Sequence, residues 1–317
     1  MCNSPITLEP FNTLHDCRDI MFNKKISRIV IVKKSMPDHD NDVINTRAVG
    51  IVTEKDISGF LFFQKPTCNI REIKIEEVMS KEPINVTVEN KIRFCAGMML
   101  NSGISSLVVN DISGNLKGIL TKSDLVRAYA SHYKGRDMIK NYMSKSVHVI
   151  KKDDALNVIL SVMVKNNISR VVVVKDRGQP IGIITSFDLV RISGIADPYF
   201  DRYSQPLEEQ RARGRNDRVI KSSQESQGAT SAQINQQLKL SSYVLQAACG
   251  YKSILLASDL MKYDPICITK DSDLTAAAQI MTQNGISGLP VIDDESSNNL
   301  VGIVTKTDIV RAISVLS

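Results

Sequence analysis

The sequence predicts an α+β fold made of four copies of one β-α-β-β-α unit. Two phrases that recur in register along the 317-residue chain carry this prediction. One phrase ends in Thr-x-x-Asp and reads GIVTEKD, GILTKSD, GIITSFD and GIVTKTD. The other phrase is Ile-Ser followed by a hydrophobic run, and it stands ahead of each Thr-x-x-Asp. Because both phrases occur four times in the same order, they indicate a structural repeat.

Each unit opens with a short strand and a helix. Apolar segments well ahead of the Ile-Ser phrase mark the strands, and they begin at Ser4, Glu82, Lys145 and Asp264. The helix is clearest at residues 154–168, where apolar side chains recur at helical spacing. Six residues before each Ile-Ser serine stands a methionine, and we expect these methionines to fill the core. They are Met21, Met99, Met163 and Met281.

Two strands and a second helix complete the unit. Runs such as VVVV and IVIV are β-branched, short and bounded by polar residues, which is typical of buried strands. The second of these strands ends at the Gly-Ile of the Thr-x-x-Asp phrase, and the threonine opens the final helix. Repeat 1 carries a longer polar loop between its two strands, MPDHDNDVINTR.

The repeats divide the chain unevenly. Successive threonines of the Thr-x-x-Asp phrase are 68, 64 and 120 residues apart, so an insertion separates repeats 3 and 4. Arginine follows Ile-Ser in repeats 1 and 3, whereas serine or glycine follows it in repeats 2 and 4. This alternation indicates two pairs, repeats 1–2 and repeats 3–4. The expected domains are repeats at 1–65, 76–132, 138–193 and 258–317, with an insertion at 194–257 that is a basic polar arm and then a helix.

Composition argues against several classes of protein. The formal net charge of +6, from 40 basic and 34 acidic residues, is mild for this length. The six cysteines lack C-x-x-C spacing and the four histidines lack an i, i+4 pair, so we expect no metal site. No nucleophile–base arrangement is visible, and we do not expect an enzyme. Because no signal peptide or apolar run of membrane length is visible, we expect a cytoplasmic protein without membrane contact.

The order of elements and both phrases resemble the CBS domain, which occurs as tandem pairs called Bateman modules. The resemblance covers about residues 1–193 and 258–317 and leaves only the insertion outside it. A Met-Ser or Met-Lys lead-in before repeats 2 to 4 also looks like the family. Repeat 1 departs, because it lacks this lead-in and Gly59 stands where the other repeats have arginine. The resemblance implies a stand-alone protein of four CBS repeats paired into two Bateman modules.

The Thr-x-x-Asp phrase has two interpretations. At a strand-to-helix junction it is close to a capping box, in which the hydroxyl bonds a free backbone N–H of the first turn. The same helix N-terminus can also bind an anion. By family resemblance, the aspartate binds the ribose diol of a nucleotide and the threonine lies near its phosphates. The candidate residues are Thr53 and Asp56, Thr121 and Asp124, Thr185 and Asp188, and Thr305 and Asp308.

The resemblance implies two further sets of nucleotide contacts. Hydrophobic residues of the first strands flank the adenine in CBS pairs, and here they are Ile6, Ile84, Val147 and Ile266. The position after Ile-Ser often supplies a basic phosphate contact, and it is Arg28 in repeat 1 and Arg170 in repeat 3. Ser106 and Gly288 make repeats 2 and 4 poorer phosphate sites. The implied function is a regulator that senses AMP, ADP or ATP, with S-adenosylmethionine less favoured, and signals to a macromolecular partner.

The insertion supports an alternative function. Through about Leu240 it is polar and rich in Gln, Ser and Arg, the composition of a solvated linker or of a segment that folds on a partner. As an RNA-contacting arm it would neutralise phosphates through Arg211, Arg213, Arg215, Arg218 and Lys221. Some archaeal stand-alone CBS proteins act on ribosomes during dormancy, so a ribosome or RNA is the leading candidate partner. A homodimer formed through the CBS modules also remains open.

Overall fold

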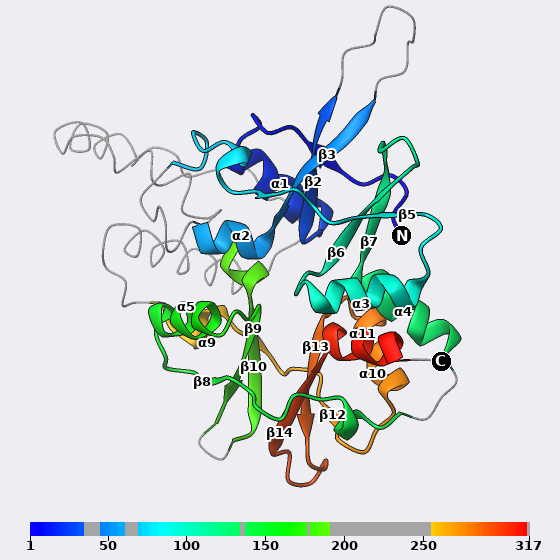
Figure 1. Cartoon of the computed structure of the whole chain (residues 1–317). Coiled ribbons are helices and arrows are strands. Elements are labelled where there is room, and N and C mark those ends of the chain that lie inside the picture. Colours follow the sequence, from blue (N-terminus) through cyan, green and yellow to red (C-terminus); the bar gives the residue numbers. More distant parts are fainter. Residues whose placement is uncertain (35–44, 61–68, 134–136, 176–177, 191–254, 316–317) are drawn as a thin grey trace, which may run out of the picture.

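The computed structural model describes residues 1–34, 45–60, 69–133, 137–175, 178–190 and 255–315, so nearly all of the predicted insertion lies outside the described residues. Within these ranges the chain forms four β-α-β-β-α units (Figure 1), which confirms the predicted α+β fold. The strands of the four sheets are β1 (Thr7–Leu8), β2 (Arg28–Lys34), β3 (Thr46–Thr53) and β4 (Ser80–Lys81); β5 (Asn85–Thr87), β6 (Ser106–Asn110) and β7 (Leu116–Thr121); β8 (Val149–Lys151), β9 (Arg170–Val174), β10 (Pro180–Thr185) and β11 (Lys262–Tyr263); and β12 (Ile268–Thr269), β13 (Gly288–Ile292) and β14 (Leu300–Thr305).

Every sheet combines parallel and antiparallel pairing. The short first strand runs parallel to the second, as β1 does to β2, and the two longer strands form an antiparallel hairpin, as β2 and β3 do. Each hairpin contains one shift of register, which in the first sheet falls between Ile31 and Val32. The β-branched runs are buried, as Val171, Val172 and Val173 illustrate. These strands therefore form core, as their composition predicts.

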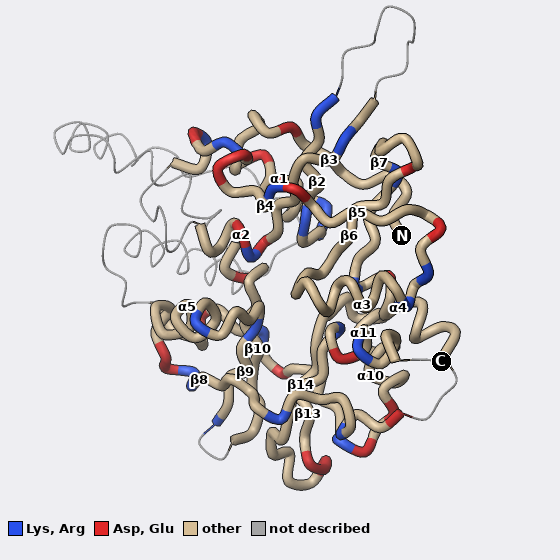
Figure 2. The backbone as a smooth tube through the Cα atoms, in the orientation of Figure 1, with Lys and Arg blue, Asp and Glu red and all other residues tan. Residues whose placement is uncertain are grey.

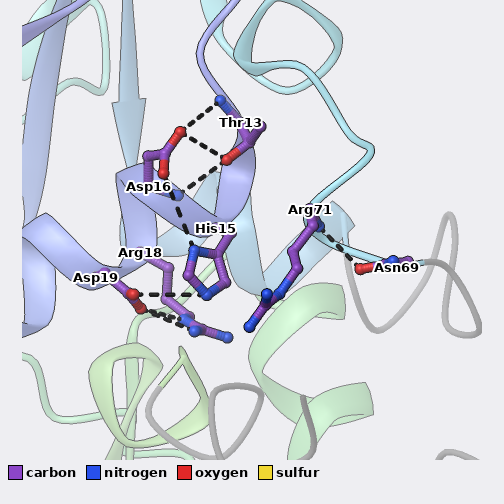
Figure 3. A network of polar contacts seen from close by, with 7 residues as sticks. All are labelled: Thr13, His15, Asp16, Arg18, Asp19, Asn69 and Arg71. Carbon is purple, nitrogen blue, oxygen red and sulfur yellow. Dashed lines mark hydrogen bonds and ion pairs between the residues drawn. The ribbon is translucent and has the colours of Figure 1, made fainter. Parts of the chain in front are cut away.

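The helices pack on the sheets. They are α1 (Leu14–Lys24), α2 (Glu54–Gly59), α3 (Ile92–Asn101), α4 (Lys122–His132), α5 (Leu156–Lys165), α9 (Ala257–Leu260), α10 (Leu274–Gln283) and α11 (Lys306–Val315). The second helix of repeat 3 is described over residues 186–190. At the start of α1, the hydroxyl and the backbone N–H of Thr13 both donate to Oδ2 of Asp16 (Figure 3). His15 and Arg18 from the same helix lie against the carboxylate of Asp19. A capping box of this kind stabilises a helix by about 1 kcal/mol.

The first helix of every repeat ends in the same way. A residue with positive φ follows the helix, namely Lys25, Gly103, Asn167 and Gly285. The isoleucine of Ile-Ser comes next and donates its backbone N–H to the carbonyl of the aligned methionine, as Ile26 does to Met21. This is the 6→1 hydrogen bond of a Schellman motif. It explains the constant spacing between methionine and Ile-Ser, and all four methionines are buried in the core as predicted.

The lead-in segments show how the repeats pair. β4 comes from the lead-in of repeat 2 and pairs with β3 of repeat 1, while β11 comes from the lead-in of repeat 4 and pairs with β10 of repeat 3. In return, Ser144 in the lead-in of repeat 3 forms a β-bridge with Ile303 of repeat 4. The chain therefore forms two modules, repeats 1–2 and repeats 3–4, as the arginine alternation predicts.

In each module the lead-in methionine packs on a glycine of the partner repeat. A Cβ on Gly50 would lie 2.6 Å from Sδ of Met79, so only glycine leaves room there. The same contact recurs between Gly182 and Met261 and between Gly302 and Met143.

Repeat 1 has a lead-in as well, so the expectation that it lacks one is wrong. A Cβ on Gly118 of repeat 2 would lie 2.5 Å from the carbonyl oxygen of Cys2 and 3.5 Å from Sδ of Met1. Cys2 also exchanges backbone hydrogen bonds with Ile119, at 3.0 and 3.1 Å. Met1 and Cys2 thus take the place that Met-Ser or Met-Lys takes in the other repeats.

Both pairs of facing repeats connect the two modules. Helices α3 and α4 of repeat 2 pack against α10 and α11 of repeat 4 (Figure 1), and their buried side chains form one continuous core. Repeats 1 and 3 meet through the stacked rings of Phe22 and Phe187, whose centroids lie 6.4 Å apart. Nζ of Lys55 in repeat 1 also donates to the backbone carbonyl of Asn167 in repeat 3, at 3.1 Å.

The cysteines, the candidate metal ligands and the apolar helices can each be located within the described ranges. Cys17 and Cys95 are buried free thiols there, whereas Cys2 is exposed. No group of three His, Cys, Asp or Glu residues in this part of the chain could hold a metal ion. No described helix is both long and apolar enough to cross a membrane.

Candidate functional site

All four Thr-x-x-Asp phrases form the same polar contact at the start of a helix. The threonine hydroxyl donates to Oδ2 of the aspartate at 2.6–2.8 Å, and the threonine backbone N–H donates to the same oxygen at 2.8–2.9 Å. In repeats 1 and 2 the aspartate backbone N–H returns a hydrogen bond to the hydroxyl, at 3.3 Å. The phrases therefore cap helices, and Oδ2 is committed to the cap. Only Oδ1 of each aspartate is left for another partner.

The four Oδ1 atoms have different surroundings. Oδ1 of Asp308 accepts from Nη1 of Arg311 at 2.9 Å, and Asp124 faces Arg127 at 3.5 Å. Oδ1 of Asp188 lies 3.6 Å from Nζ of Lys262, which belongs to the lead-in of repeat 4. Oδ1 of Asp56 forms no hydrogen bond or ion pair with another described residue. Gly59 stands at the position of Arg127 and Arg311, so the arginine that pairs with the aspartate in repeats 2 and 4 is replaced here.

The two arginines after Ile-Ser each cross to the neighbouring repeat. Nη1 of Arg28 donates to the carbonyl of Ser105 in repeat 2 at 2.7 Å and to its hydroxyl at 2.9 Å. Arg170 reaches repeat 4, where a Cβ on Gly288 would lie 2.2 Å from its Nη1. That nitrogen is buried and has no hydrogen-bond partner in the described structure. The small residues of repeats 2 and 4 thus adjoin the arginines of repeats 1 and 3.

Two lysines that sequence reasoning missed lie beside these arginines. Nζ of Lys122 donates to the hydroxyl of Thr307 at 3.0 Å, and Nζ of Lys306 donates to that of Ser123 at 2.8 Å. The two bonds are reciprocal and join repeat 2 to repeat 4. Each lysine directly follows the threonine of its Thr-x-x-Asp phrase, and this recurrence was the signal in the sequence.

Four cationic side chains form a central basic cluster. Repeats 1–2 contribute Arg28 and Lys122, and repeats 3–4 contribute Arg170 and Lys306. Burial, followed by repulsion from Arg170 and Arg28, lowers the pKa of Lys306 to about 8. Burial also lowers the pKa of Lys122 and lowers that of Arg170 to about 10. Glu54 attracts both arginines and Lys306, and burial raises its own pKa. Cations held this close in a desolvated place favour an anionic ligand.

The apolar residues expected beside an adenine occupy equivalent places. Ile6, Ile84, Val147 and Ile266 each lie in the short connection between a lead-in and the first strand of a repeat. Ile84 packs against the joint core of repeats 2 and 4, whereas Ile266 is exposed. Their role at an adenine stays a prediction. The RNA-contact candidates, Arg211, Arg213, Arg215, Arg218 and Lys221, lie outside the described residues.

The repeat signature matches a known protein family. The CBS domain matches at residues 1–62, 75–131, 139–194 and 257–315, which together make up more than half of the chain. This chain belongs to the CBS-domain family. The two modules described above are therefore CBS pairs, each built from adjacent repeats with exchanged lead-ins.

One relative matches over nearly the whole chain. The uncharacterized protein MJ1225 of Methanocaldococcus jannaschii is 23% identical over an alignment of 317 positions, which covers 96% of this chain and 94% of that protein. Its crystal structure, described as that of a proposed archaeal homologue of g-AMPK, matches with a TM-score of 0.71 at 21% identity. The match covers 98% of this chain and 96% of that one. This likeness shows a shared fold of four CBS repeats.

Two solved CBS pairs match about half of the chain. The pair of protein MJ0100, in complex with 5-methylthioadenosine and S-adenosyl-L-methionine, covers 56% of this chain and 96% of its own at 20% identity and a TM-score of 0.35. CBSX2 of Arabidopsis thaliana, in complex with AMP, covers 55% of this chain and 94% of its own at 18% identity and a TM-score of 0.35. All three of these ligands contain adenosine.

Proposed function

We propose that this protein is a non-catalytic regulator that binds adenosine-containing nucleotides and passes their occupancy to a macromolecular partner. The buried Nη1 of Arg170, which has no hydrogen-bond partner in the described structure, carries the proposal. A buried N–H without an acceptor is costly, and an anion that reaches it removes that cost. Phosphate is an acceptor that suits the planar guanidinium well.

The neighbours of Arg170 favour a ligand with several negative charges. Arg28, Lys122 and Lys306 are close enough that repulsion among them contributes to the lowered lysine pKa values. A phosphate tail placed among these cations would relieve the repulsion and strengthen the charged hydrogen bonds. AMP, ADP and ATP supply such a tail. S-adenosylmethionine, whose sulfonium is itself a cation, suits the cluster less well.

The capping aspartates would bind the ribose of the nucleotide. A carboxylate accepts hydrogen bonds only, and the two hydroxyls of a ribose diol are suitable donors. The helix cap uses Oδ2 of each aspartate, so Oδ1 is available to accept from the ribose in Asp56, Asp124, Asp188 and Asp308. The apolar residues ahead of the first strands would then flank the adenine.

Ligand binding would act on the arrangement of the two modules. The central basic cluster takes Arg28 and Lys122 from one module and Arg170 and Lys306 from the other. A phosphate tail that contacts both pairs has a higher affinity for the arrangement that holds the four cations together. Such differential affinity shifts the population toward that arrangement. A partner that recognises it would then sense nucleotide occupancy.

Calorimetric titration of AMP, ADP, ATP and S-adenosylmethionine tests the proposal. We expect saturable binding by the wild type and loss of one site in each of Asp56→Ala and Asp188→Ala. Asp271→Ala serves as the control, because this exposed aspartate forms a surface ion pair with Lys140. Circular dichroism would verify that the variants are folded. Wild-type titrations in both variants would refute the assignment of these aspartates.

The ribosome- or RNA-binding alternative depends on the insertion, which is outside the described residues. In the described chain, basic and acidic residues are interspersed on both modules (Figure 2). Sedimentation of cell extract on a sucrose gradient, at low and high salt, would show whether the protein travels with ribosomal subunits. Co-migration that is lost on deleting residues 204–240 would support the alternative.

A further inference from the structure

The modules meet at two contacts, repeat 2 against repeat 4 and repeat 1 against repeat 3. Between repeats 2 and 4, side chains of α3, α4, α10 and α11 form a continuous core. Between repeats 1 and 3 there is a cavity of about 410 Å³. It lies between α2 and α5, which face each other in Figure 1. A volume of this size is in the usual range for small-molecule sites, roughly 300–1,000 Å³.

The lining of the cavity combines apolar and polar side chains in similar numbers. The apolar side chains are Phe60, Val78, Leu160, Met163, Val164, Ile168 and Leu189. The polar side chains are Lys55, Asp56, Ser58, Glu77, Asn167 and Ser186. Apolar walls suit an aromatic base, whereas a carboxylate suits the diol of a sugar. The lining therefore matches a ribonucleoside better than a purely apolar ligand.

Gly59 stands where repeats 2 and 4 have an arginine that faces the capping aspartate. In the equivalent position, Arg127 lies 3.5 Å from Asp124, and Arg311 lies 2.9 Å from Asp308. Gly59 lines the cavity, and a Cβ placed on it would meet no atom within 4 Å. A Cβ therefore has space at this position, and an arginine there would have the same i, i+3 spacing to Asp56 as Arg127 has to Asp124.

We propose that the cavity between repeats 1 and 3 binds the nucleoside part of a ribonucleotide, and that Gly59 selects repeat 1 as an open site. The inference rests on the proposed adenine-nucleotide function and adds which site is open. For that one site it places the base in the cavity instead of beside the first strand. Asp56 would accept hydrogen bonds from the ribose, and the base would lie among Phe60 and the apolar side chains of α5. Because the cavity is lined by both modules, an occupant would hold repeat 1 against repeat 3.

The variant Gly59→Arg tests this inference. Arginine favours helix over glycine by about 0.8 kcal/mol, so the change should not unfold α2. The matched control is Gly97→Arg in α3, where a Cβ also meets nothing within 4 Å and the added charge is the same. Asp56→Asn is a second variant, which removes the carboxylate charge and keeps the shape of the side chain.

Calorimetry with AMP and with 2′-deoxy-AMP gives the readout. We expect Gly59→Arg and Asp56→Asn each to lose one bound equivalent of AMP that Gly97→Arg and the wild type retain. Binding of this equivalent by the wild type should also be weaker with 2′-deoxy-AMP than with AMP, because the ribose diol is incomplete. Wild-type stoichiometry and affinity in Gly59→Arg would overturn the inference and leave the proposed function standing. A wild type that binds no AMP, ADP or ATP would overturn both.

Discussion

Nη1 of Arg170 occupies the space that a side chain at residue 288 would need, since a Cβ on Gly288 would lie 2.2 Å away. The arginine belongs to repeat 3 and the glycine to repeat 4, so the contact joins the two halves of one CBS pair. The next nearest atom to such a Cβ outside the arginine is the carbonyl oxygen of Val304, at 3.2 Å. Repeat 4 therefore has glycine after Ile-Ser because the arginine of its partner repeat lies there.

Gly288→Ala should weaken nucleotide binding without unfolding the protein. The added methyl group displaces the end of a flexible side chain, so Arg170 moves away from the central basic cluster. Because a hydrogen bond to a charged group contributes about 1.5–3 kcal/mol, we expect ATP affinity to fall at least roughly tenfold. Calorimetry measures the affinity, and Gly97→Ala is the control. An unchanged affinity for ATP would show that Arg170 does not contact the ligand.

Gly302→Ala should destabilise the module of repeats 3 and 4. A Cβ there would lie 2.7 Å from Sδ of Met143 and 3.1 Å from the backbone carbonyl of Ser144, which cannot easily move. Overpacking of this kind costs about 1–3 kcal/mol. Urea denaturation measures the free energy of unfolding. Gly97→Ala, in an open helix position, should instead be neutral or stabilising, and equal stabilities of the two variants would refute the lead-in contact.

Lys306 should make nucleotide binding depend on pH. The pKa of Lys306 in the folded protein is about 8, below the ordinary value of 10.5. Between about pH 8 and 10.5 the unfolded protein therefore binds more protons at this lysine than the folded protein does. The free energy of unfolding accordingly rises with pH across this window. A bound phosphate favours the charged lysine and raises that pKa. We therefore expect proton uptake on binding near pH 8 and weaker binding at about pH 9 than at about pH 7.

Calorimetry in buffers of different ionisation enthalpy detects this proton uptake. The variant Lys306→Met should abolish it, whereas Lys140→Met, at an exposed lysine paired with Asp271, should not. Proton uptake that persists in Lys306→Met would assign the titration to another group.

The bond between Lys122 and Thr307 should couple the modules. The bond crosses from repeat 2 to repeat 4 at 3.0 Å, among partly buried groups. A double-mutant cycle with Lys122→Met and Thr307→Val should give a coupling energy of about 0.5–1.5 kcal/mol in the free energy of unfolding. A coupling energy of zero would mean that the lysine is held by something other than this hydroxyl.

Features that depend on near neighbours in the chain could be predicted from the sequence. The Thr-x-x-Asp caps involve residues three apart, and the methionine that precedes Ile-Ser is tied to it by one helix end. The burial of the β-branched strands follows from their composition alone. The pairing of repeats 1–2 and 3–4 was also readable, because Arg28 and Arg170 recur in alternate repeats.

Features that depend on contacts between repeats could not be predicted in this way. The lead-in of repeat 1 was missed because Met1 and Cys2 do not fit a Met-Ser or Met-Lys pattern. A Met-x-x-x-Pro-Ile pattern, shared by residues 1–6, 79–84 and 261–266, would have found it. Lys122 and Lys306 form their hydrogen bonds to Thr307 and Ser123 because the fold packs repeat 2 against repeat 4.

The effect of Gly59 could not be predicted from the sequence either. The sequence shows that repeat 1 has glycine where the other repeats have arginine, but not how this change affects the site. Its consequence needs the position of α5, which comes from another module and borders the cavity that Asp56 lines.

Titration of ATP into the wild type and into Arg170→Met tests the central claim most directly. The account predicts saturable binding by the wild type and an affinity at least roughly tenfold lower in the folded variant, because Nη1 is lost as a phosphate donor. Equal affinities, or no binding by the wild type, would contradict the account.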